Sequence, residues 1–175
     1  MLRLMLLRHA KSDWADTAVH DHDRPLSGRG WSAAEAVGLH MHQHNLCPST
    51  VLCSTALRTR QTLIEIMPYM RDNTKIHLLR DLYNSSESDY VDTICSLGAF
   101  SPTLLVVGHN TAIQETALEL TGSGSPELIS QMEQKYPTAG MAIIDFDARR
   151  WSEVGRAAGR LVSFFQPRTL KAVSN

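Results

Sequence analysis

Short apolar runs alternate along the chain with segments whose apolar positions recur at helical spacing. Four runs are predicted to be strands: Leu2 to Leu7, Thr50 to Cys53, Ile76 to Leu79, and Thr103 to Val107. The first run is almost uninterrupted, which is typical of a strand buried on both faces. Four helix patterns lie between and after these runs: one capped by Ser27 that runs through Met41, one capped by Thr55 and ended by Pro68, Asp89 to Leu97, and Thr111 to Leu120. The alternation predicts an α/β fold, with a mainly parallel sheet between two layers of helices.

The last third of the chain departs from this alternation. Met141 to Phe146 and Arg160 to Phe165 are strand patterns with no helix between them, so we expect an antiparallel pair at one edge of the sheet. Gly122 to Pro126 is interpreted as a loop, and Pro167 to Asn175 as a frayed tail. The chain shows no repeat, low-complexity stretch or linker. We therefore expect residues 1–175 to form a single domain.

Composition narrows the function classes. The 175 residues carry 17 Lys and Arg against 18 Asp and Glu, so no overall field favours nucleic acid or an anionic membrane, and any anion site must be built locally. No apolar run approaches the roughly 18 residues of a membrane span, and the apolar start is too short for a signal peptide. Three widely spaced cysteines without a C-x-x-C motif fit a reducing compartment. We expect a cytoplasmic protein.

Polar side chains with phosphate-binding chemistry follow three of the predicted strands. Arg8 and His9 come after the first strand, Ser54 and Arg58 after the second, and His109 after the fourth. Ligands bind outside the carboxyl ends of strands in an open parallel sheet, and guanidinium groups bind phosphoryl oxygens with paired hydrogen bonds. The residues alone thus indicate a phosphate-type anion site, without specifying a reaction.

Arg58 is unusual in its local setting. With Arg60 it lies in the first turns of a predicted helix, where the helix dipole disfavours cations by about 0.3–1 kcal/mol. No carboxylate nearby in sequence offsets these charges. A bound anion would offset them; the alternative is a surface arginine that water screens.

Four segments resemble, in order, the signature motifs of the histidine phosphatase superfamily, whose fold is that of phosphoglycerate mutase. They are Arg8-His9-Ala10, Asp23-Arg24-Pro25-Leu26-Ser27, Ser54 to Thr62 with Arg58 and Gln61 inside it, and Gly108-His109. The resemblance spans roughly residues 3 to 145. The short chain, the Arg-His-Ala triplet and the Asp-Arg-Pro-Leu segment are most similar to the SixA-type phosphohistidine phosphatases.

The resemblance implies a three-layer sandwich and a mechanism without metal or cofactor. His9 is the implied nucleophile, which attacks phosphorus and forms a phosphohistidine that water then hydrolyses. Arg8, Arg58 and His109 are implied to bind the phosphoryl oxygens, and Ser12 is a further candidate for substrate binding. Ala10 replaces the glycine usual in the motif, and Ala15 replaces an asparagine common in phosphoglycerate-handling members, which counts against mutase activity.

The general acid is less well defined. Relatives of the mutase type carry a carboxylate after the third strand, where Asp81 lies in this chain. Asp13, Asp21 and Glu87 are alternatives, and any of the four is otherwise a solvated surface charge. A phosphohistidine leaves as imidazole and needs less protonation than a sugar alkoxide, so an imperfect acid site is compatible with a labile phosphoryl donor.

Taken together, these features predict a phosphatase, and among phosphatases they favour one that acts on phosphohistidine in a protein. The short chain lacks the insertions that cover the pocket in larger members, and an open pocket would admit a side chain on a protein surface. A broad phosphomonoesterase that acts on small phosphate esters and a non-catalytic phosphate-binding module are the alternatives.

The other histidines are assigned no catalytic role. His40 and His44 have the i,i+4 spacing of zinc ligands, but no third ligand frames them, and we expect a solvated helix end. The His20 to Asp23 run is interpreted as a polar entrance loop, and His77 as a structural residue within a strand.

Overall fold

The computed structural model describes residues 1–83 and 90–167 of the chain. Seven strands form one sheet: β1 (Leu2–Arg8), β2 (Thr50–Ser54), β3 (Lys75–Leu79), β4 (Thr103–Gly108), β5 (Thr121–Gly124), β6 (Met141–Phe146) and β7 (Gly159–Phe165). Five α-helices accompany them: α1 (Gly28–Gln43), α2 (Leu57–Ile66), α3 (Tyr90–Leu97), α4 (Ala112–Leu120) and α5 (Pro126–Gln134). Three short 3₁₀ helices, η1 (Asp21–Asp23), η2 (Met67–Tyr69) and η3 (Trp151–Glu153), lie between these elements.

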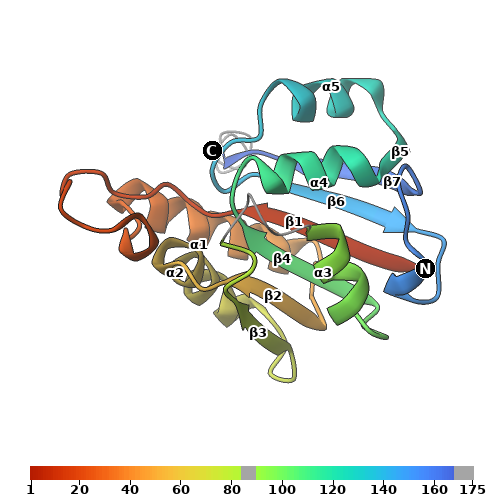
Figure 1. Ribbon diagram of the computed structural model, residues 1–175, viewed down its shortest axis with the longest axis horizontal. Coiled ribbons are helices and arrows are strands. Elements are labelled where there is room, and N and C mark those ends of the chain that lie inside the picture. The colour runs from red at the N-terminus through yellow and green to blue at the C-terminus, as the bar shows by residue number, and fades with distance from the viewer. Residues whose placement is uncertain (84–89, 168–175) are drawn as a thin grey trace.

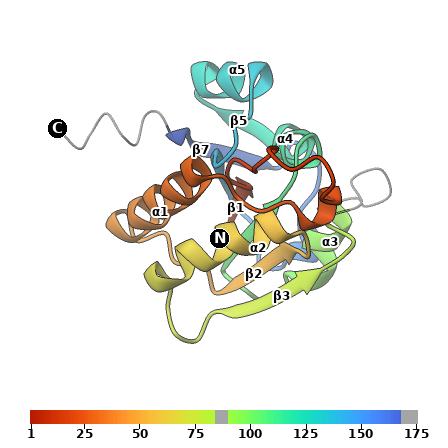
Figure 2. The same ribbon diagram turned by 90° about the vertical axis from the view of Figure 1, so that its left-hand side faces the viewer.

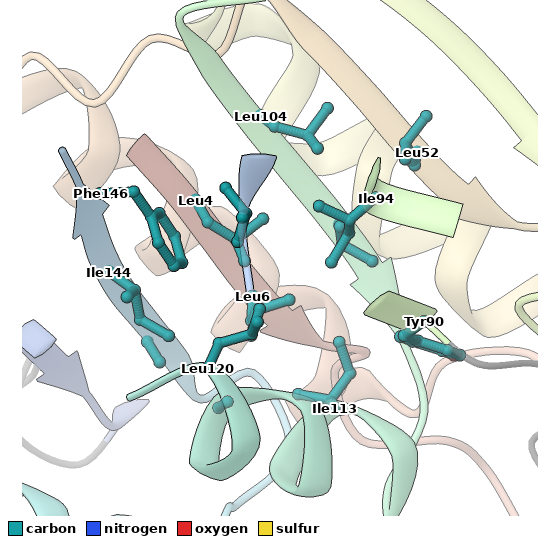
Figure 3. Packing of buried hydrophobic residues seen from close by; sticks show 14 of the residues in the cluster. Leu4, Leu6, Leu52, Tyr90, Ile94, Leu104, Ile113, Leu120, Ile144 and Phe146 are labelled. Carbon is teal, nitrogen blue, oxygen red and sulfur yellow. The ribbon is translucent and has the colours of Figure 1, made fainter. Parts of the chain in front are cut away.

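The sheet separates two hydrophobic cores, as expected for three layers. Its strand order is β3-β2-β4-β1-β6-β7-β5, and α3 and α4 lie over one face while α1 and α2 lie behind the other (Figure 1). Successive residues of β1 serve the two cores in turn: Leu4 and Leu6 pack with α3 and α4, whereas Met5 and Leu7 pack with α1 and α2. Figure 3 shows the first core, where strand side chains meet those of α3 and α4.

Parallel pairing at the centre of the sheet brings three strand ends to one edge. β1 pairs with β4, and β4 with β2, all in parallel. In the β1–β4 register Arg8 lies opposite Gly108. The residues that follow these two strands are therefore neighbours in space.

The predicted α/β architecture and all six predicted strands are confirmed, and Ser27 caps α1 by accepting a hydrogen bond from the amide of Gly30. β6 and β7 are antiparallel as expected, but they are not at the edge, because β5 adds to β7 in parallel. Gly122 to Pro126 was wrongly interpreted as a loop: most of it belongs to β5 and to the first residue of α5. Most of the expected tail, residues 168–175, lies outside the described residues.

The cap of α2 also differs from the prediction. Ala56 rather than Thr55 is the N-cap residue, and its side chain makes no capping bond. The hydroxyl of Thr55 instead lies 3.1 Å from Nε2 of His22, in the loop after β1. Thr55, which the local pattern assigned as the cap of the helix, therefore contacts a residue distant in sequence instead.

None of the helices in the described segments is long and apolar enough to cross a membrane. The three cysteines are free, with Cys53 buried and Cys47 and Cys95 half-buried.

Candidate active site

The candidate site lies where the carboxyl ends of β1, β2 and β4 meet. His9 follows β1, His109 follows β4, and Ser54 ends β2; Arg58 lies in the first turn of α2. The segment after β1, red in Figure 2, passes across this end of the sheet. The structure thus brings together four of the residues that the motifs singled out, from positions up to about 100 residues apart in the chain.

His9 is held in one tautomer. Its Nδ1 lies 2.7 Å from the carbonyl oxygen of Ala10, which can only accept, so Nδ1 carries the proton. Nε2 is then the unprotonated nitrogen with a free lone pair. The backbone of His9 is fixed as well, since its amide donates to the carbonyl of Gly108 and its carbonyl accepts from the amide of Ala139. This is the arrangement that an imidazole nucleophile requires.

Burial keeps the His9 ring neutral. Only 8% of His9 is exposed. Desolvation lowers its pKa to about 4; the bond to Ala10 opposes this shift, and the charges of Arg58 and Arg8 add to it. At neutral pH, Nε2 is therefore available for attack.

Asp21 forms an ion pair with Arg58. The guanidinium of Arg58 donates to the backbone carbonyl of Asp21 and, at 3.0 Å, to its carboxylate. The hydroxyl of Tyr83 donates to the same carboxylate oxygen at 3.0 Å. Partial burial raises the pKa of Asp21, but the Tyr83 bond and the Arg58 charge outweigh it, so the net pKa lies below the ordinary value. The anion that offsets Arg58 at the start of α2 is thus a carboxylate 37 residues earlier in the chain.

His109 is fixed between Arg58 and Ser54. A guanidinium only donates, so the 3.3 Å contact from Nη2 of Arg58 assigns Nδ1 of His109 as the acceptor. Nε2 then donates to the hydroxyl of Ser54 at 2.8 Å. Burial lowers the pKa of His109 to about 3, helped by the His9 and Arg58 neighbours. The His109 and His9 ring centroids are 5.2 Å apart.

Thr62 and Tyr90 hold the backbone around these side chains. The Thr62 hydroxyl accepts from the amide of Ala10 at 3.0 Å and donates to the carbonyl of Arg58 at 2.7 Å. The Tyr90 hydroxyl donates to the carbonyl of Leu82 and accepts from the amide of His109. One buried hydroxyl therefore links the two segments that carry His9 and Arg58, and another supports His109.

Arg8 points a partly unpaired guanidinium at the site. Its Nη1 donates to the carbonyl of Tyr136 at 2.7 Å, while its buried Nε has no hydrogen-bond partner among the described residues. Arg8 lines a cavity of about 240 Å³. The remaining lining residues are His9, Lys11, Ser12, Trp14, Asp21, Arg58 and Thr138.

Four of the predicted site residues line this cavity: Arg8, His9, Ser12 and Arg58. His109 does not line it, although its ring packs beside that of His9. Asp81 is exposed and is absent from the lining, whereas Asp21 is part of it. Asp13 is exposed and accepts from the amide of Ala15. Glu87 lies outside the described residues.

Sequence reasoning did not assign roles to Lys11, Trp14, Thr138 or Tyr83. Lys11 and Trp14 follow Arg8-His9 directly, so their position after β1 was a usable signal. Thr138 comes from the segment before β6, where no motif marks it. Tyr83 reaches the site through Asp21, 62 residues away, which the chain pattern does not reveal.

None of the remaining histidines lines the cavity, although His22 packs edge-on against Tyr83. His40 and His44 stack at 3.9 Å between ring centroids, and His40 also packs edge-on against Phe165. His40 is thus half-buried rather than on the solvated helix end that we expected, because β7 ends beside it. His77 is exposed on β3. Over residues 1–83 and 90–167, no group of three or more His, Cys, Asp or Glu side chains is placed to hold a metal ion.

Comparison with known proteins places these observations in a family. Residues 4–91 match the family model of the histidine phosphatase superfamily, branch 1. An uncharacterized protein of Mycobacterium tuberculosis is 34% identical over 93% of this chain and 100% of its own length.

Solved structures agree with this match. The putative phosphohistidine phosphatase SixA of Agrobacterium tumefaciens is 28% identical, with a TM-score of 0.78 over 95% of this chain and 98% of its own. The corresponding putative enzyme of Nakamurella multipartitia is also 28% identical, with a TM-score of 0.80 over 95% of this chain and 96% of its own.

Proposed function

The chain belongs to the histidine phosphatase superfamily, whose phosphatases use a histidine nucleophile and require no metal. From this premise we propose that it removes the phosphoryl group from phosphohistidine in a protein. In this proposal His9 is the nucleophile, and Arg8, Arg58 and His109 bind the phosphoryl oxygens. The observation that carries it is the fixed tautomer of buried His9, with Nε2 unprotonated beside a cavity lined by two arginines.

The first half-reaction forms one bond and breaks one. Nε2 of His9 attacks phosphorus in line, the new N–P bond forms, and the P–N bond of the substrate breaks, so that its imidazole leaves with the bonding electron pair. Water then attacks the phosphorus of phospho-His9, which releases inorganic phosphate and restores neutral His9. Guanidinium groups stabilise the charge spread over the equatorial oxygens in both steps.

A phosphoryl group entering the cavity competes with Asp21 for Arg58. The carboxylate of Asp21 accepts from Nη2 of Arg58, a donor that a phosphoryl oxygen would also use. A dianion binds the planar donor fork more strongly than a half-exposed carboxylate does. The Asp21 contact therefore keeps Arg58 oriented until substrate replaces it.

The acid chemistry of the cavity supports a weakly basic leaving group. Asp21 is the carboxylate in the cavity lining, and its lowered pKa keeps it ionised at neutral pH, so it is a poor proton donor. An alkoxide leaving group requires such a donor, whereas a phosphohistidine that is protonated on its other nitrogen leaves as neutral imidazole. Asp81 is exposed and does not line the cavity, and its role as general acid stays a prediction. A phosphohistidine substrate would need this acid less than a phosphate ester would.

The cytoplasmic location is part of the same proposal. Free thiols at Cys47, Cys53 and Cys95 fit a reducing compartment.

The proposal is tested by trapping the intermediate. Wild-type protein incubated with a phosphohistidine-bearing protein should acquire an acid-labile phosphoryl group on His9, identified by mass spectrometry of peptides. His9→Ala should lose both the phosphoenzyme and turnover, while His77→Ala, which removes an exposed histidine on β3, should keep both. Phosphoenzyme in His9→Ala would refute the assigned nucleophile.

Substrate class is tested in the same preparation. We expect kcat/KM to be higher for the phosphohistidine protein than for small phosphate monoesters. A reversed order would favour a small-molecule phosphomonoesterase, and no turnover of either would contradict the proposal.

A further inference from the structure

We propose that a basic groove beside the catalytic cavity binds carboxylates that flank the phosphorylated side chain on the protein substrate. This inference rests on the proposed function and adds a determinant of substrate choice. The groove, of about 470 Å³, shares Arg8, Lys11 and Thr138 with the catalytic cavity. Its other lining residues are Arg29, Ala33, Lys135, Pro137, Gln166 and Pro167.

The charge of the groove has one sign. Arg8, Lys11, Arg29 and Lys135 line it, and no Asp or Glu does. The chain as a whole carries a formal net charge of -1, so this concentration of cations is local. A cleft lined by one sign of charge raises the concentration of oppositely charged groups near it. The groove is therefore selective for anions.

Three of these four cations have no side-chain partner among the described residues. Within the parts of the chain that the structure describes, the side chains of Lys11, Arg29 and Lys135 form no ion pair and no hydrogen bond. Arg58 and Arg3, in contrast, each contact a carboxylate. An anion that enters the groove would displace only water from Lys11, Arg29 and Lys135.

Three elements contribute the cations. Lys11 follows β1, Arg29 lies in the first turn of α1, and Lys135 caps the end of α5. α1 and α5 appear as separate helices in Figure 2, with the end of β7 between them. The charges therefore line an extended surface that begins at the catalytic cavity.

The exposure of the cations favours a protein over a small anionic metabolite. A site for one small anion gathers buried, convergent donors, as Arg58 does in the catalytic cavity. Lys11, Arg29 and Lys135 are all exposed, so each can follow a carboxylate on a facing protein surface. Trp14 adds to this surface: it lines the catalytic cavity, yet it is 65% exposed. Exposed tryptophan and arginine side chains are enriched among the residues that dominate protein interfaces.

The experiment compares two phosphohistidine peptides of equal length, one with Asp and Glu flanks and one with Ser and Asn flanks. The measured quantity is the ratio of kcat/KM for the acidic peptide to kcat/KM for the neutral one. In Arg29→Glu/Lys135→Glu this ratio should fall about tenfold from the wild-type value at low salt, mainly through KM, because reversed charges repel the flanking carboxylates. The loss should shrink at high salt.

Lys75→Glu is the matched control. Lys75 is exposed on β3, an outer strand of the sheet, and it does not line the groove. The substitution should therefore leave the ratio of kcat/KM values unchanged. Should the double variant fold poorly, Lys135→Glu alone should lower the ratio by a smaller factor in the same direction.

A binding measurement separates this inference from the proposed function. The affinity of the unphosphorylated acidic peptide for His9→Ala, followed by fluorescence anisotropy, should fall when Arg29→Glu/Lys135→Glu is added, whatever the protein hydrolyses. An unchanged ratio together with unchanged peptide affinity would overturn the groove. The same proteins are also tested with a small bisphosphate as competitor of the peptide. If Arg29→Glu/Lys135→Glu abolished this competition but left peptide affinity unchanged, the groove would bind a metabolite and the inference would be overturned.

Discussion

The catalytic cavity and the basic groove share Arg8 and Lys11 but hold their other cations in opposite ways. In the cavity, Arg58 contacts the carboxylate and carbonyl of Asp21 and the ring nitrogen of His109. In the groove, Arg29 and Lys135 are exposed, and neither forms an ion pair among the described residues. The same charge is thus held by partners in one region and exposed to solvent in the other.

This difference separates two tasks of anion recognition. Stabilising a transition state requires donors that are already oriented when charge develops, because reorientation would add to the barrier. Selecting a partner requires only that the encounter be favoured, which mobile surface charges achieve through long-range attraction. In our proposal these two tasks belong to adjacent surfaces of the molecule.

Replacing one arginine from each region is the strongest way to test the contrast. Arg58→Ala should lower kcat for a phosphohistidine peptide by roughly 10²–10³-fold, as loss of an oriented transition-state donor does. Arg29→Ala should act through KM and by less than about fivefold, as expected for an exposed charge. Steady-state kinetics of the two variants on the same peptide measures both. Similar losses in kcat would abolish the distinction.

A second prediction concerns the hydroxyl that joins the two catalytic segments. Thr62→Val keeps the shape of the side chain but leaves the buried amide of Ala10 without its partner, so the free energy of unfolding should fall by about 1–3 kcal/mol. kcat should fall as well, because His9 and Arg58 lose their common support. Urea unfolding and kinetics check both effects. Thr62→Ser keeps the hydroxyl and should retain most of the stability and most of kcat. Losses in Thr62→Ser as large as those in Thr62→Val would contradict the role assigned to the two hydrogen bonds.

A third prediction concerns the dependence of stability on pH. Burial lowers the pKa values of His9 and His109 to about 4 and 3, below the ordinary histidine value of 6.5. Below that ordinary value the unfolded chain binds protons that the folded chain does not, so the free energy of unfolding falls as pH falls. Each residue contributes at most about 1.4 kcal/mol per pH unit.

Chemical denaturation between pH 7 and pH 5 measures this slope. His109→Gln should reduce it, whereas His77→Gln, at an exposed position, should not. An equal slope in wild type and His109→Gln would show that burial of His109 does not control its protonation.

Much of the site was predictable because strand ends and motifs are local in sequence. Arg8 and His9 directly follow the apolar run of β1, and His109 directly follows that of β4, so alternation of strands and helices was enough to bring them to one edge. The carboxylate contact was not predictable. Asp21 meets Arg58 and Tyr83 across 37 and 62 residues, and nothing in the local pattern encodes that pairing.

The misassigned loop shows a different limit. Thr121 to Gly124 has a sequence typical of a turn, yet it pairs with β7 through its backbone. A Cβ on Gly122 would lie 1.8 Å from the carbonyl oxygen of Ala157, so glycine there permits close approach of two chain segments. α5 was not predicted, although Leu128, Ile129 and Met132 recur at helical spacing and pack in the first core. Its first residue, Pro126, belongs to the segment that was interpreted as a loop.

The pairing of Arg8 with Gly108 sets the spacing of the two histidines. Each imidazole belongs to the first residue after a strand, and the amide of His9 continues the ladder by donating to Gly108. A strand advances about 3.3 Å per residue and alternates its faces, so inserting one residue into β1 or β4 would offset one ring from the other by that step. The register between β1 and β4 thus fixes the distance between the rings of His9 and His109. Loops around the site can change length without altering this distance, whereas an insertion in either strand would change it.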